Sequence, residues 1–299
     1  MIILSILAIV ALIAIYIGSM FLPSMLYSHG FDKARIAKRT IVGHRGGAGI
    51  GAENSLACFK RGIASGADMI EIDIHLTKDG VVVVSHDPTV DRMTNGEGKI
   101  EDMTYDEISH LRIESKEGVL TNEHIPTFNQ TLELFAAERA KGRNVGLLVE
   151  IKLPYKDAYK GIERKMLEEI KAHNAEDWIT VQSFSDDVIE RVYNLDHNIR
   201  IEKLMICKLP WLPLIIDGMR IVKFDYKKYH YVSSFNVYYK GLTRSLINDI
   251  HAHGKEVKMW TIQGLDASDS AQHQGTLREA PLCEIYRRGS RDMCQTDRA

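Results

Sequence analysis

Cysteine is scarce in this chain, and neither sign of charge dominates it. Four cysteines among 299 residues are too few for a disulfide framework, and their spacing matches no metal-binding pattern. The 38 basic and 40 acidic residues nearly cancel, which excludes a protein that binds nucleic acid through bulk positive charge. A hydrophobic content of 45% excludes a disordered chain. The composition therefore predicts a folded protein with no nucleic-acid partner.

Charge is missing from the first thirty residues, because residues 1–30 contain no Asp, Glu, Lys or Arg. Segment 2–22 is nearly all apolar and long enough for a helix that crosses a bilayer. A cleaved signal peptide would begin with basic residues, and a buried core helix rarely lacks charge over such a length. Residues 1–30 are therefore predicted to form a transmembrane anchor, with the signal peptide and the core helix as alternatives.

A basic juxtamembrane linker is expected at residues 31–39, which contain Lys33, Arg35, Lys38 and Arg39. The positive-inside rule places such charges on the cytoplasmic side of a membrane. The predicted localisation is therefore a membrane, with a single-pass N-terminal anchor and the remaining chain in the cytoplasm. The sequence leaves the oligomeric state open.

Strands alternate with helices from residue 40 to residue 262. The expected strands lie at 41–43, 69–76, 81–84, 146–151, 179–182, 200–206, 232–236 and 257–262, and the expected helices at 53–64, 128–141, 157–173, 186–195 and 243–253. Such alternation predicts a mainly parallel sheet, and around eight strands in roughly 250 residues favour a TIM (β/α)8 barrel, an α/β fold. Segment 88–125 is interpreted as a small insertion, and segment 208–229 as a surface loop.

Charged side chains recur with a period of two in strands that should be apolar. Glu71 and Asp73 share one face of the strand 69–76, and Glu150 and Lys152 share one face at the end of the strand 146–151. Carboxylates that converge inside a barrel favour a cation with oxygen ligands, either Mg²⁺ or Ca²⁺. Paired structural charges are the equal alternative.

Two histidines follow strands beside charged residues: His44 precedes Arg45, and His86 precedes Asp87. Catalytic groups of a barrel gather at the C-terminal ends of its strands, and histidine suits general acid–base chemistry near neutral pH. Arg45 and Lys152 are cations of the kind that a phosphoryl group requires. Together these residues predict the hydrolysis of a phosphate ester. Asn54, which opens a helix, has the residue type of an N-cap.

An ordered set of motifs carries a family resemblance. The motifs are His44-Arg45-Gly46, Glu53-Asn54-Ser55, Glu71-Ile72-Asp73, Ser85-His86-Asp87-Pro88, Glu150-Ile151-Lys152, Gln182-Ser183-Phe184 and Trp260-Thr261. Through them, residues 40–262 resemble the glycerophosphodiester phosphodiesterase family. The resemblance implies a TIM barrel with a small insertion, a divalent cation as cofactor, and hydrolysis of glycerophosphodiesters to sn-glycerol 3-phosphate and an alcohol.

The resemblance also implies a role for each matched position. Glu71, Asp73 and Glu150 would bind the metal, and His44 and His86 would be the catalytic acid and base, in an order that stays open. Arg45 and Lys152 would bind the phosphate, Trp260 would line the glycerol end, and Asn54 would support the site.

Two alternative functions remain. The glycine-rich loop after His44-Arg45, together with an anchor, is similar to family members that act on lysophospholipids as a lysophospholipase D. Residues 263–299 form an atypical C-terminal tail, in which Gln263 stands where the family usually has Asn. This tail is interpreted either as ordinary divergence or as an incomplete last βα unit. An incomplete unit would make the protein an inactive anchored remnant.

Overall fold

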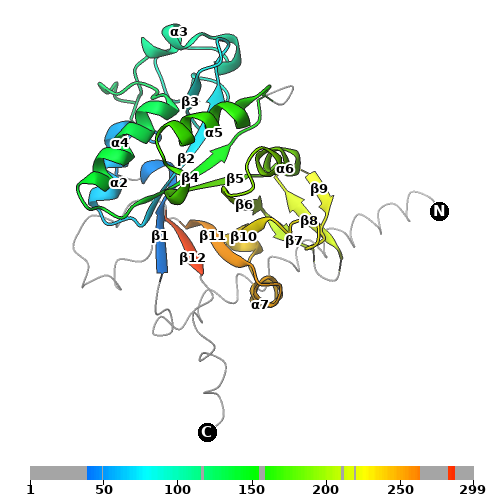
Figure 1. Ribbon diagram of the computed structural model, residues 1–299. Helices are drawn as coiled ribbons and strands as arrows, with labels where there is room; N and C mark the ends of the chain where they lie inside the picture. Colours follow the sequence, from blue (N-terminus) through cyan, green and yellow to red (C-terminus); the bar gives the residue numbers. More distant parts are fainter. Residues whose placement is uncertain are drawn as a thin grey trace, which may run out of the picture.

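The computed structural model of the chain describes most of the region between residues 39 and 286 (Figure 1). The described residues are 39–48, 50–115, 118–154, 159–209, 212–218, 220–262 and 282–286. Within these ranges, strands and helices alternate as the sequence predicts, and they build an α/β barrel of the TIM type.

A closed ring of strands forms the centre of the molecule. A nine-stranded sheet runs in the order β1-β12-β11-β10-β6-β5-β4-β2-β3, and β1 also pairs with β2, which closes the ring and leaves β3 outside it. The ring contains β1 (Arg39–Gly43), β2 (Met69–Leu76), β4 (Gly146–Ile151), β5 (Ile179–Ser183), β6 (Arg200–Met205), β10 (Val232–Tyr238), β11 (Glu256–Ile262) and β12 (Leu282–Tyr286). The short strand β3 (Val82–Val84) runs antiparallel to β2.

Helices cover the outside of the ring because one side of each strand is apolar. In β2, the alternate residues Ile70, Ile72 and Ile74 are fully buried in the large core cluster that also contains the inner faces of the helices. The covering helices are α2 (Leu56–Ala64), α4 (Phe128–Ala140), α5 (Ile162–Ala172), α6 (Asp186–Leu195) and α7 (Arg244–Ala252). Short 3-10 turns are η2 (His44–Gly46), η3 (Ile100–Asp102), η4 (Glu176–Trp178) and η5 (Tyr239–Gly241).

The segment after β3 forms a small lobe with its own apolar cluster. It contains η3 and the short helix α3 (Tyr105–Ser109), which lies at the top of Figure 1. Its cluster consists of Val83, Val90, Ile100, Ile108, Ile113 and Ile125, all buried. Because these side chains pack mainly on one another, the lobe can sit beside the strand ends without contributing to the core of the barrel.

The prediction of a surface loop at 208–229 is wrong. This segment contributes to a three-stranded antiparallel sheet of β7 (Cys207–Lys208), β8 (Leu214–Asp217) and β9 (Arg220–Lys223), drawn at the right of Figure 1. Ile215 and Tyr229 are fully buried, so the segment packs on the barrel instead of running over its surface. Pro213 directly precedes β8, and Phe224 and Tyr229 are buried, in a segment whose periodicity gives little indication of strand pairing.

The strand that closes the ring differs from an all-parallel (β/α)8 barrel. β12 runs antiparallel to both of its neighbours, β1 and β11. Ile262 at the end of β11 pairs with Leu282 at the start of β12, so the two strands meet at the same end of the ring. An antiparallel pair needs no helical crossover, whereas a parallel strand would have to start at the opposite end. Most of the predicted tail 263–299 lies outside the described residues.

The predicted localisation, a membrane with a single-pass N-terminal anchor, is corrected by the structure. Across the part of the chain that the structure describes, no helix has the length and apolar character needed to cross a membrane. Residues 1–30, on which the prediction of an anchor rested, lie outside the described residues, as does the linker up to residue 38.

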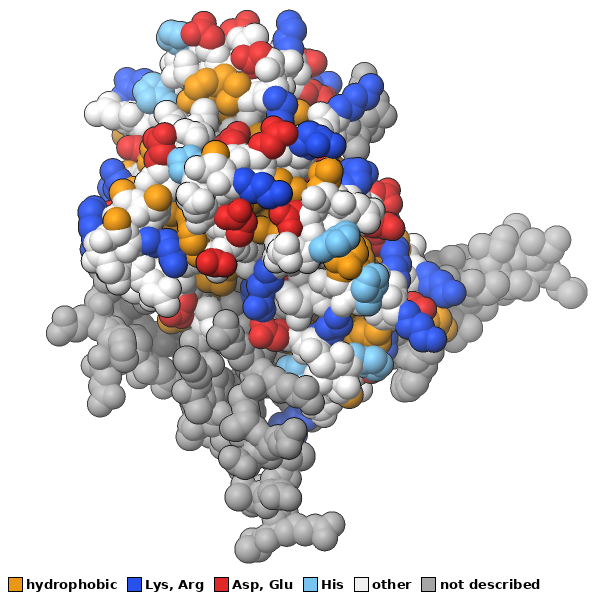
Figure 2. Space-filling model, viewed as in Figure 1, with side chains coloured by type: hydrophobic (Ala, Val, Ile, Leu, Met, Phe, Trp, Pro, Cys, Tyr) orange, Lys and Arg blue, Asp and Glu red, His pale blue; other side chains and the backbone are white. Residues whose placement is uncertain are grey.

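The surface shows the mixed charge that the composition predicts. On the face drawn in Figure 2, acidic and basic side chains are interspersed over the described part of the molecule, and neither sign forms a continuous field. This pattern agrees with the formal net charge of −2. The charges that matter for chemistry are therefore those that the fold gathers locally.

Candidate active site

Three carboxylates from two adjacent strands converge inside the barrel. One oxygen each from Glu71, Asp73 and Glu150 lies within 4.8 Å of the others, and all three residues are buried. Glu71 and Asp73 belong to β2, and Glu150 belongs to β4, where it pairs in register with Asp73. The period of two in a strand puts these side chains on the inner face, as the sequence predicts. Such a cluster is the kind of oxygen-rich site that can hold a divalent cation.

Two cationic side chains border the carboxylates. The ammonium of Lys152 lies 3.0 Å from Asp73 Oδ1 and 2.8 Å from Glu150 Oε1. Arg45 donates its backbone N–H to Glu71 Oε2 at 2.9 Å, and its guanidinium Nε lies 3.8 Å from Asp73 Oδ2. The fold therefore brings both predicted phosphate-binding residues to the carboxylate cluster.

The turn that carries His44 and Arg45 has an unusual backbone. Arg45 has φ +50° and Asn54 has φ +55°, both in the left-handed region that non-glycine residues rarely adopt. The helix α2 packs so closely under this turn that a Cβ at Gly62 would collide with the carbonyl oxygen of Gly46. Backbone strain of this kind is often found where a fold has to present specific side chains to a ligand.

Asn54 does not cap the following helix, which was the alternative that its residue type suggested. The N-cap of α2 is Ser55, whose hydroxyl accepts from the Cys58 backbone N–H. Asn54 instead donates from Nδ2 to Asp73 Oδ2 at 3.0 Å, and its side chain is buried. It therefore supports a member of the carboxylate cluster, which agrees with the supporting role that the family resemblance implies.

Burial and mutual repulsion set the protonation of the carboxylates. Burial, reinforced by the charges of Asp73 and Glu150, raises the pKa of Glu71 well above its usual value. Burial also raises the pKa of Glu150. Burial acts in the same direction on Asp73, but Lys152 and the other surrounding cations outweigh it and hold the pKa of Asp73 below its usual range. Crowded carboxylates with opposed pKa shifts are typical of functional sites, including those that bind a cation.

Both predicted histidines lie at this site. His44 Nε2 is 3.9 Å from Glu71 Oε2, and burial, together with the charge of Arg45, lowers the pKa of His44 to about 3. Burial also lowers the pKa of His86, whose ring is subject to the charges of Asp73 and Lys152. Both imidazoles are therefore neutral near pH 7 in the structure, and a neutral imidazole can accept a proton.

A hydrogen bond and a chain of ion pairs connect His86 to Arg45. His86 Nδ1 contacts Asp87 Oδ1 at 2.6 Å, and Asp87 pairs in turn with Arg92. Arg92 Nη2 also donates to Glu53 Oε1 at 2.7 Å, which accepts from Arg45 Nη1 at 3.0 Å. The sequence does not indicate a role for Arg92, because an arginine in a polar insertion has no local pattern that marks it. Asp87 and Glu53 lie within motifs of the family resemblance, and this membership is the feature of the sequence that indicated a role for them.

Trp260 lies on the inner side of β11, farther around the ring. Its Nε1 donates to the Asn236 carbonyl at 2.9 Å, and its ring packs edge-on against Phe184 and at a tilt against Tyr238. Phe184 follows β5, within the motif quoted above. Three aromatic rings at or near the ends of β5, β10 and β11 therefore form an apolar wall that could contact the carbon skeleton of a substrate.

Buried polar atoms without partners mark where a ligand would fit. At the candidate site, Arg45 Nε, Asn54 Oδ1 and Asp73 Oδ1 are buried and lack a hydrogen bond, although Asp73 keeps its ion pair with Lys152. Unsatisfied buried polar groups are costly and need an explanation. A cation on the carboxylates and an anionic group beside Arg45 would together satisfy them, so the donor set fits a metal-bound phosphate.

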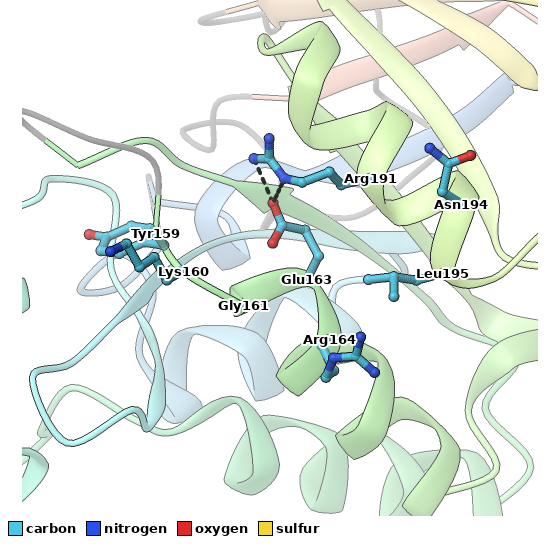
Figure 3. Close-up of a pocket in the computed structure, with 8 residues that line it drawn as sticks. All are labelled: Tyr159, Lys160, Gly161, Glu163, Arg164, Arg191, Asn194 and Leu195. Carbon is cyan, nitrogen blue, oxygen red and sulfur yellow. Dashed lines mark hydrogen bonds and ion pairs between the residues drawn. The ribbon is translucent and has the colours of Figure 1, made fainter.

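A separate pocket of ≈ 510 Å³ lies outside the ring, between the start of α5 and the end of α6 (Figure 3). Arg191 and Glu163 form an ion pair across it, and Arg164 and Leu195 lie on its other side. None of its lining residues belongs to the carboxylate cluster. The chemistry of the chain is therefore concentrated inside the barrel.

Comparison with known proteins agrees with this geometry. Residues 44–275 match the model of the Glycerophosphoryl diester phosphodiesterase family. A glycerophosphodiester phosphodiesterase of Caldanaerobacter subterraneus subsp. tengcongensis is 31% identical over 261 residues, which cover 84% of this chain and 99% of that protein. A human lysophospholipase D is 31% identical over 188 residues, which cover 60% of this chain and 55% of that protein.

A solved structure shares the fold. An Oleispira antarctica phosphodiesterase, in complex with the product sn-glycerol-3-phosphate, matches with a TM-score of 0.61 at 24% sequence identity. The match covers 74% of this chain and 84% of that one. At this identity the likeness supports the barrel fold, and the family is supported by the sequence matches.

Proposed function

Because the chain belongs to the Glycerophosphoryl diester phosphodiesterase family, we propose that it hydrolyses glycerophosphodiesters to sn-glycerol 3-phosphate and an alcohol. The observation that supports this best is the convergence of three buried carboxylates with Arg45, Lys152 and two neutral histidines. A divalent cation and a negative phosphodiester together complement this set. The cation would neutralise the carboxylates, and the phosphodiester would pair with Arg45 and Lys152.

Glu71, Asp73 and Glu150 would hold the cation, which we propose to be Mg²⁺ or Ca²⁺ because all three donors are hard oxygens. When bound, it supplies Lewis-acid stabilisation of negative charge on the phosphoryl oxygens. Lys152 contacts two of these carboxylates, so its ammonium is fixed at the edge of the cluster. Burial disfavours this ammonium, but Asp73 and Glu150 outweigh that effect and raise the pKa of Lys152, so the charge persists at neutral pH.

Arg45 and Lys152 orient the phosphate, and the histidines move protons. In our proposal, the glycerol hydroxyl of the substrate attacks phosphorus and its proton passes to one histidine. The other histidine has to enter this step as an imidazolium, a form that the adjacent negative phosphodiester favours, and it gives its extra proton to the oxygen of the departing alcohol, whose bond to phosphorus breaks. Water then opens the cyclic phosphate, and the two histidines exchange roles so that each returns to its starting state.

The contact with Asp87 gives His86 a defined orientation for this work. A carboxylate can only accept, so the proton on the His86 ring lies on Nδ1, 2.6 Å from Asp87 Oδ1. His86 Nε2 is then the nitrogen that can exchange protons with a substrate. Trp260, with Phe184 and Tyr238, would contact the glycerol carbons.

The test is release of glycerol 3-phosphate from a panel of glycerophosphodiesters that differ in the alcohol. We expect turnover with Mg²⁺ or Ca²⁺ and none with a chelator. The variants His44→Ala and His86→Ala should stay folded and lose about 10²–10⁴-fold in kcat, the usual contribution of a general acid or base. Cooperative thermal melting without any turnover would contradict the proposal and favour the inactive remnant.

Lysophospholipids are a second candidate substrate class. The resemblance to a human lysophospholipase D supports this candidate, since both families of substrate contain a phosphodiester next to a glycerol. Parallel assays with glycerophosphocholine and lysophosphatidylcholine separate the two. Faster choline release from the lysophospholipid, with lysophosphatidic acid as the other product, would make the lysophospholipase D activity the principal one.

A further inference from the structure

His75 is a fully buried imidazole at the active site that the proposed mechanism does not use. It lies on β2, two residues after Asp73. Its Nδ1 is 2.7 Å from the hydroxyl of Tyr159, and its Nε2 is 3.2 Å from the backbone carbonyl oxygen of His86. The rings of His75 and Tyr159 meet edge to face, with centroids 5.7 Å apart. Both nitrogens of this ring are therefore occupied by specific partners.

The direction of these hydrogen bonds follows from the chemistry of the partners. A carbonyl oxygen can only accept, so Nε2 of His75 has to carry a proton. Burial favours the neutral form of an imidazole, and in that form Nδ1 has a lone pair and accepts. The hydroxyl of Tyr159 is then the donor. Tyr159 consequently fixes the tautomer of His75 that can hold the carbonyl of His86.

This contact begins where the regular pairing of β2 and β3 ends. Val84 pairs in register with Ile74, and the Ser85 backbone N–H still donates to the Asp73 carbonyl at 3.0 Å. His86, the residue after Ser85, lies two residues beyond the end of β3, and its carbonyl is bound by the side chain of His75. At His86, the side chain of His75 therefore binds the backbone in place of the regular strand pairing. His86 is the residue whose imidazole has to be oriented toward the substrate.

We propose that His75 and Tyr159 are positioning residues for His86 in the reaction proposed above, on which this inference rests. His75, which is oriented by Tyr159, binds the backbone carbonyl of His86, while Asp87 binds Nδ1 of the His86 imidazole. The two contacts restrict both ends of the residue, so Nε2 of His86 keeps a constant place beside the carboxylate cluster. Contacts of this kind lower the reorganisation that precedes proton transfer.

The experiment compares Tyr159→Phe and His75→Leu with the unsubstituted full chain. Tyr159→Phe removes one of the two contacts of His75, and His75→Leu removes both, each with little change in volume. We expect kcat to fall on the order of tenfold with KM changed less than about twofold, because the substrate-binding groups are untouched. The conservative variant His75→Gln keeps a donor for the carbonyl and an acceptor for the hydroxyl, and it should recover most of the lost kcat.

Tyr229→Phe is the matched control. Tyr229 is also buried, and its hydroxyl bonds to Asp186 outside the ring, so its loss removes a buried hydrogen bond without reaching His86. It should lower the melting temperature about as much as Tyr159→Phe and leave kcat unchanged. If Tyr159→Phe and His75→Leu fold and retain kcat within about twofold of the unsubstituted chain, the positioning role is overturned.

Nitrogen-15 NMR of the histidine rings tests the inference independently of turnover. His75 should show the neutral Nε2-protonated tautomer at pH 7, and Tyr159→Phe should shift the ring signals of His86, whereas Tyr229→Phe should not. An Nδ1-protonated His75, or unchanged His86 signals, would overturn it. An inactive wild-type chain with the expected NMR result would count against the proposed function alone.

Discussion

Lys258 places its ammonium 2.5 Å from both carboxylate oxygens of Glu202 inside the barrel, and both side chains are buried. Asn236 joins the pair by donating to Glu202 Oε2 at 2.9 Å and to Gln182 Oε1 at 2.6 Å. Gln182 pairs in register with both Glu150 and Glu202. The polar layer thus continues around the ring from the carboxylate cluster, and its charges are satisfied within the fold.

Removing one member of this buried pair should destabilise the protein strongly. Glu202→Gln leaves Lys258 as an uncompensated buried cation, and we expect a loss of about 3–5 kcal/mol in the free energy of unfolding. The double variant Glu202→Leu with Lys258→Met should recover most of this loss, because neither charge is left unpaired. Urea denaturation of the single and double variants measures both values.

The pair between the exposed Lys171 and the half-buried Asp196 provides the control for that series. Lys171→Gln should change the free energy of unfolding by less than about 1 kcal/mol, since an ion pair with a solvent-exposed ammonium contributes little. If Glu202→Gln were as mild as Lys171→Gln, the Glu202–Lys258 pair would not be buried in solution as the structure has it.

Asp73→Asn should abolish the response of the protein to divalent cations. Asp73 contacts Lys152 and Asn54 and belongs to the carboxylate cluster, so neutralising it removes a ligand and the charge that attracts the cation. For the unsubstituted chain, we expect Mg²⁺ or Ca²⁺ at a hundred times its Kd to raise the free energy of unfolding by about 2.7 kcal/mol.

Thermal melting and titration calorimetry, with and without a chelator, measure this effect. Glu133→Gln on the exposed side of α4 is the control and should keep the full response. An undiminished shift in Asp73→Asn would mean that the cation binds elsewhere.

Arg92 is expected to matter for catalysis although it lies in the insertion. It pairs with both Asp87 and Glu53, which orient His86 and Arg45 respectively. Arg92→Ala should lower kcat/KM on the order of tenfold, as is usual when a group behind a ligand-binding residue is lost. Arg92→Lys should recover little, because an ammonium cannot reproduce the forked geometry of a guanidinium.

Steady-state kinetics on a glycerophosphodiester, with Arg164→Ala as control, provides the measurement. Arg164 lines the outer pocket between α5 and α6, away from the carboxylate cluster. Equal effects of the two arginine substitutions would indicate a general loss of positive charge and would count against the ion-pair chain.

Glu169 should make the stability of the protein depend on pH. Burial raises the pKa of Glu169 to about 7, and its Oε2 is buried without a partner. Between the usual pKa of glutamate and about 7, the unfolded chain releases this proton while the folded chain keeps it. The free energy of unfolding therefore falls as pH rises through that interval.

Glu169→Gln should remove this loss and stabilise the protein at pH 8 by about 1–2 kcal/mol, a value reduced for the partial exposure of the side chain. At pH 4 the substitution should have little effect, because the carboxyl is then protonated in both states. Denaturation at the two pH values, with the exposed neighbour Glu168→Gln as control, checks the sign.

The carboxylate cluster could be predicted from sequence because it depends on local geometry. A strand turns alternate side chains to the same face, so Glu71 and Asp73 had to share a side once β2 was recognised. The parallel arrangement then placed Glu150 beside them, since adjacent strands of a βα alternation pair in register. His44 follows the ring strand β1, whereas His86 comes to the same region because β3 runs antiparallel to β2 and ends beside Ile74.

Pairings between distant residues could not be predicted in this way. Glu202 and Lys258 are 56 residues apart, and Arg92 reaches Glu53 across 39 residues. No local period relates such positions, so each looks like an ordinary surface charge in the sequence. The sheet β7-β8-β9 was missed for the same reason, because its short strands pair without a long apolar pattern.

The sequence by itself determined the fold class, the family, and which side chains share a strand face, since these depend on spacing along the chain and on matched motifs. Only the tertiary structure decided that β12 closes the ring antiparallel, that Lys258 and Glu202 neutralise each other, and that His75 binds the carbonyl of His86. These are contacts between segments whose relative placement follows from packing the whole core. The residues next to each partner in the sequence do not specify these contacts, because the contacts form only when the closed barrel brings distant segments together.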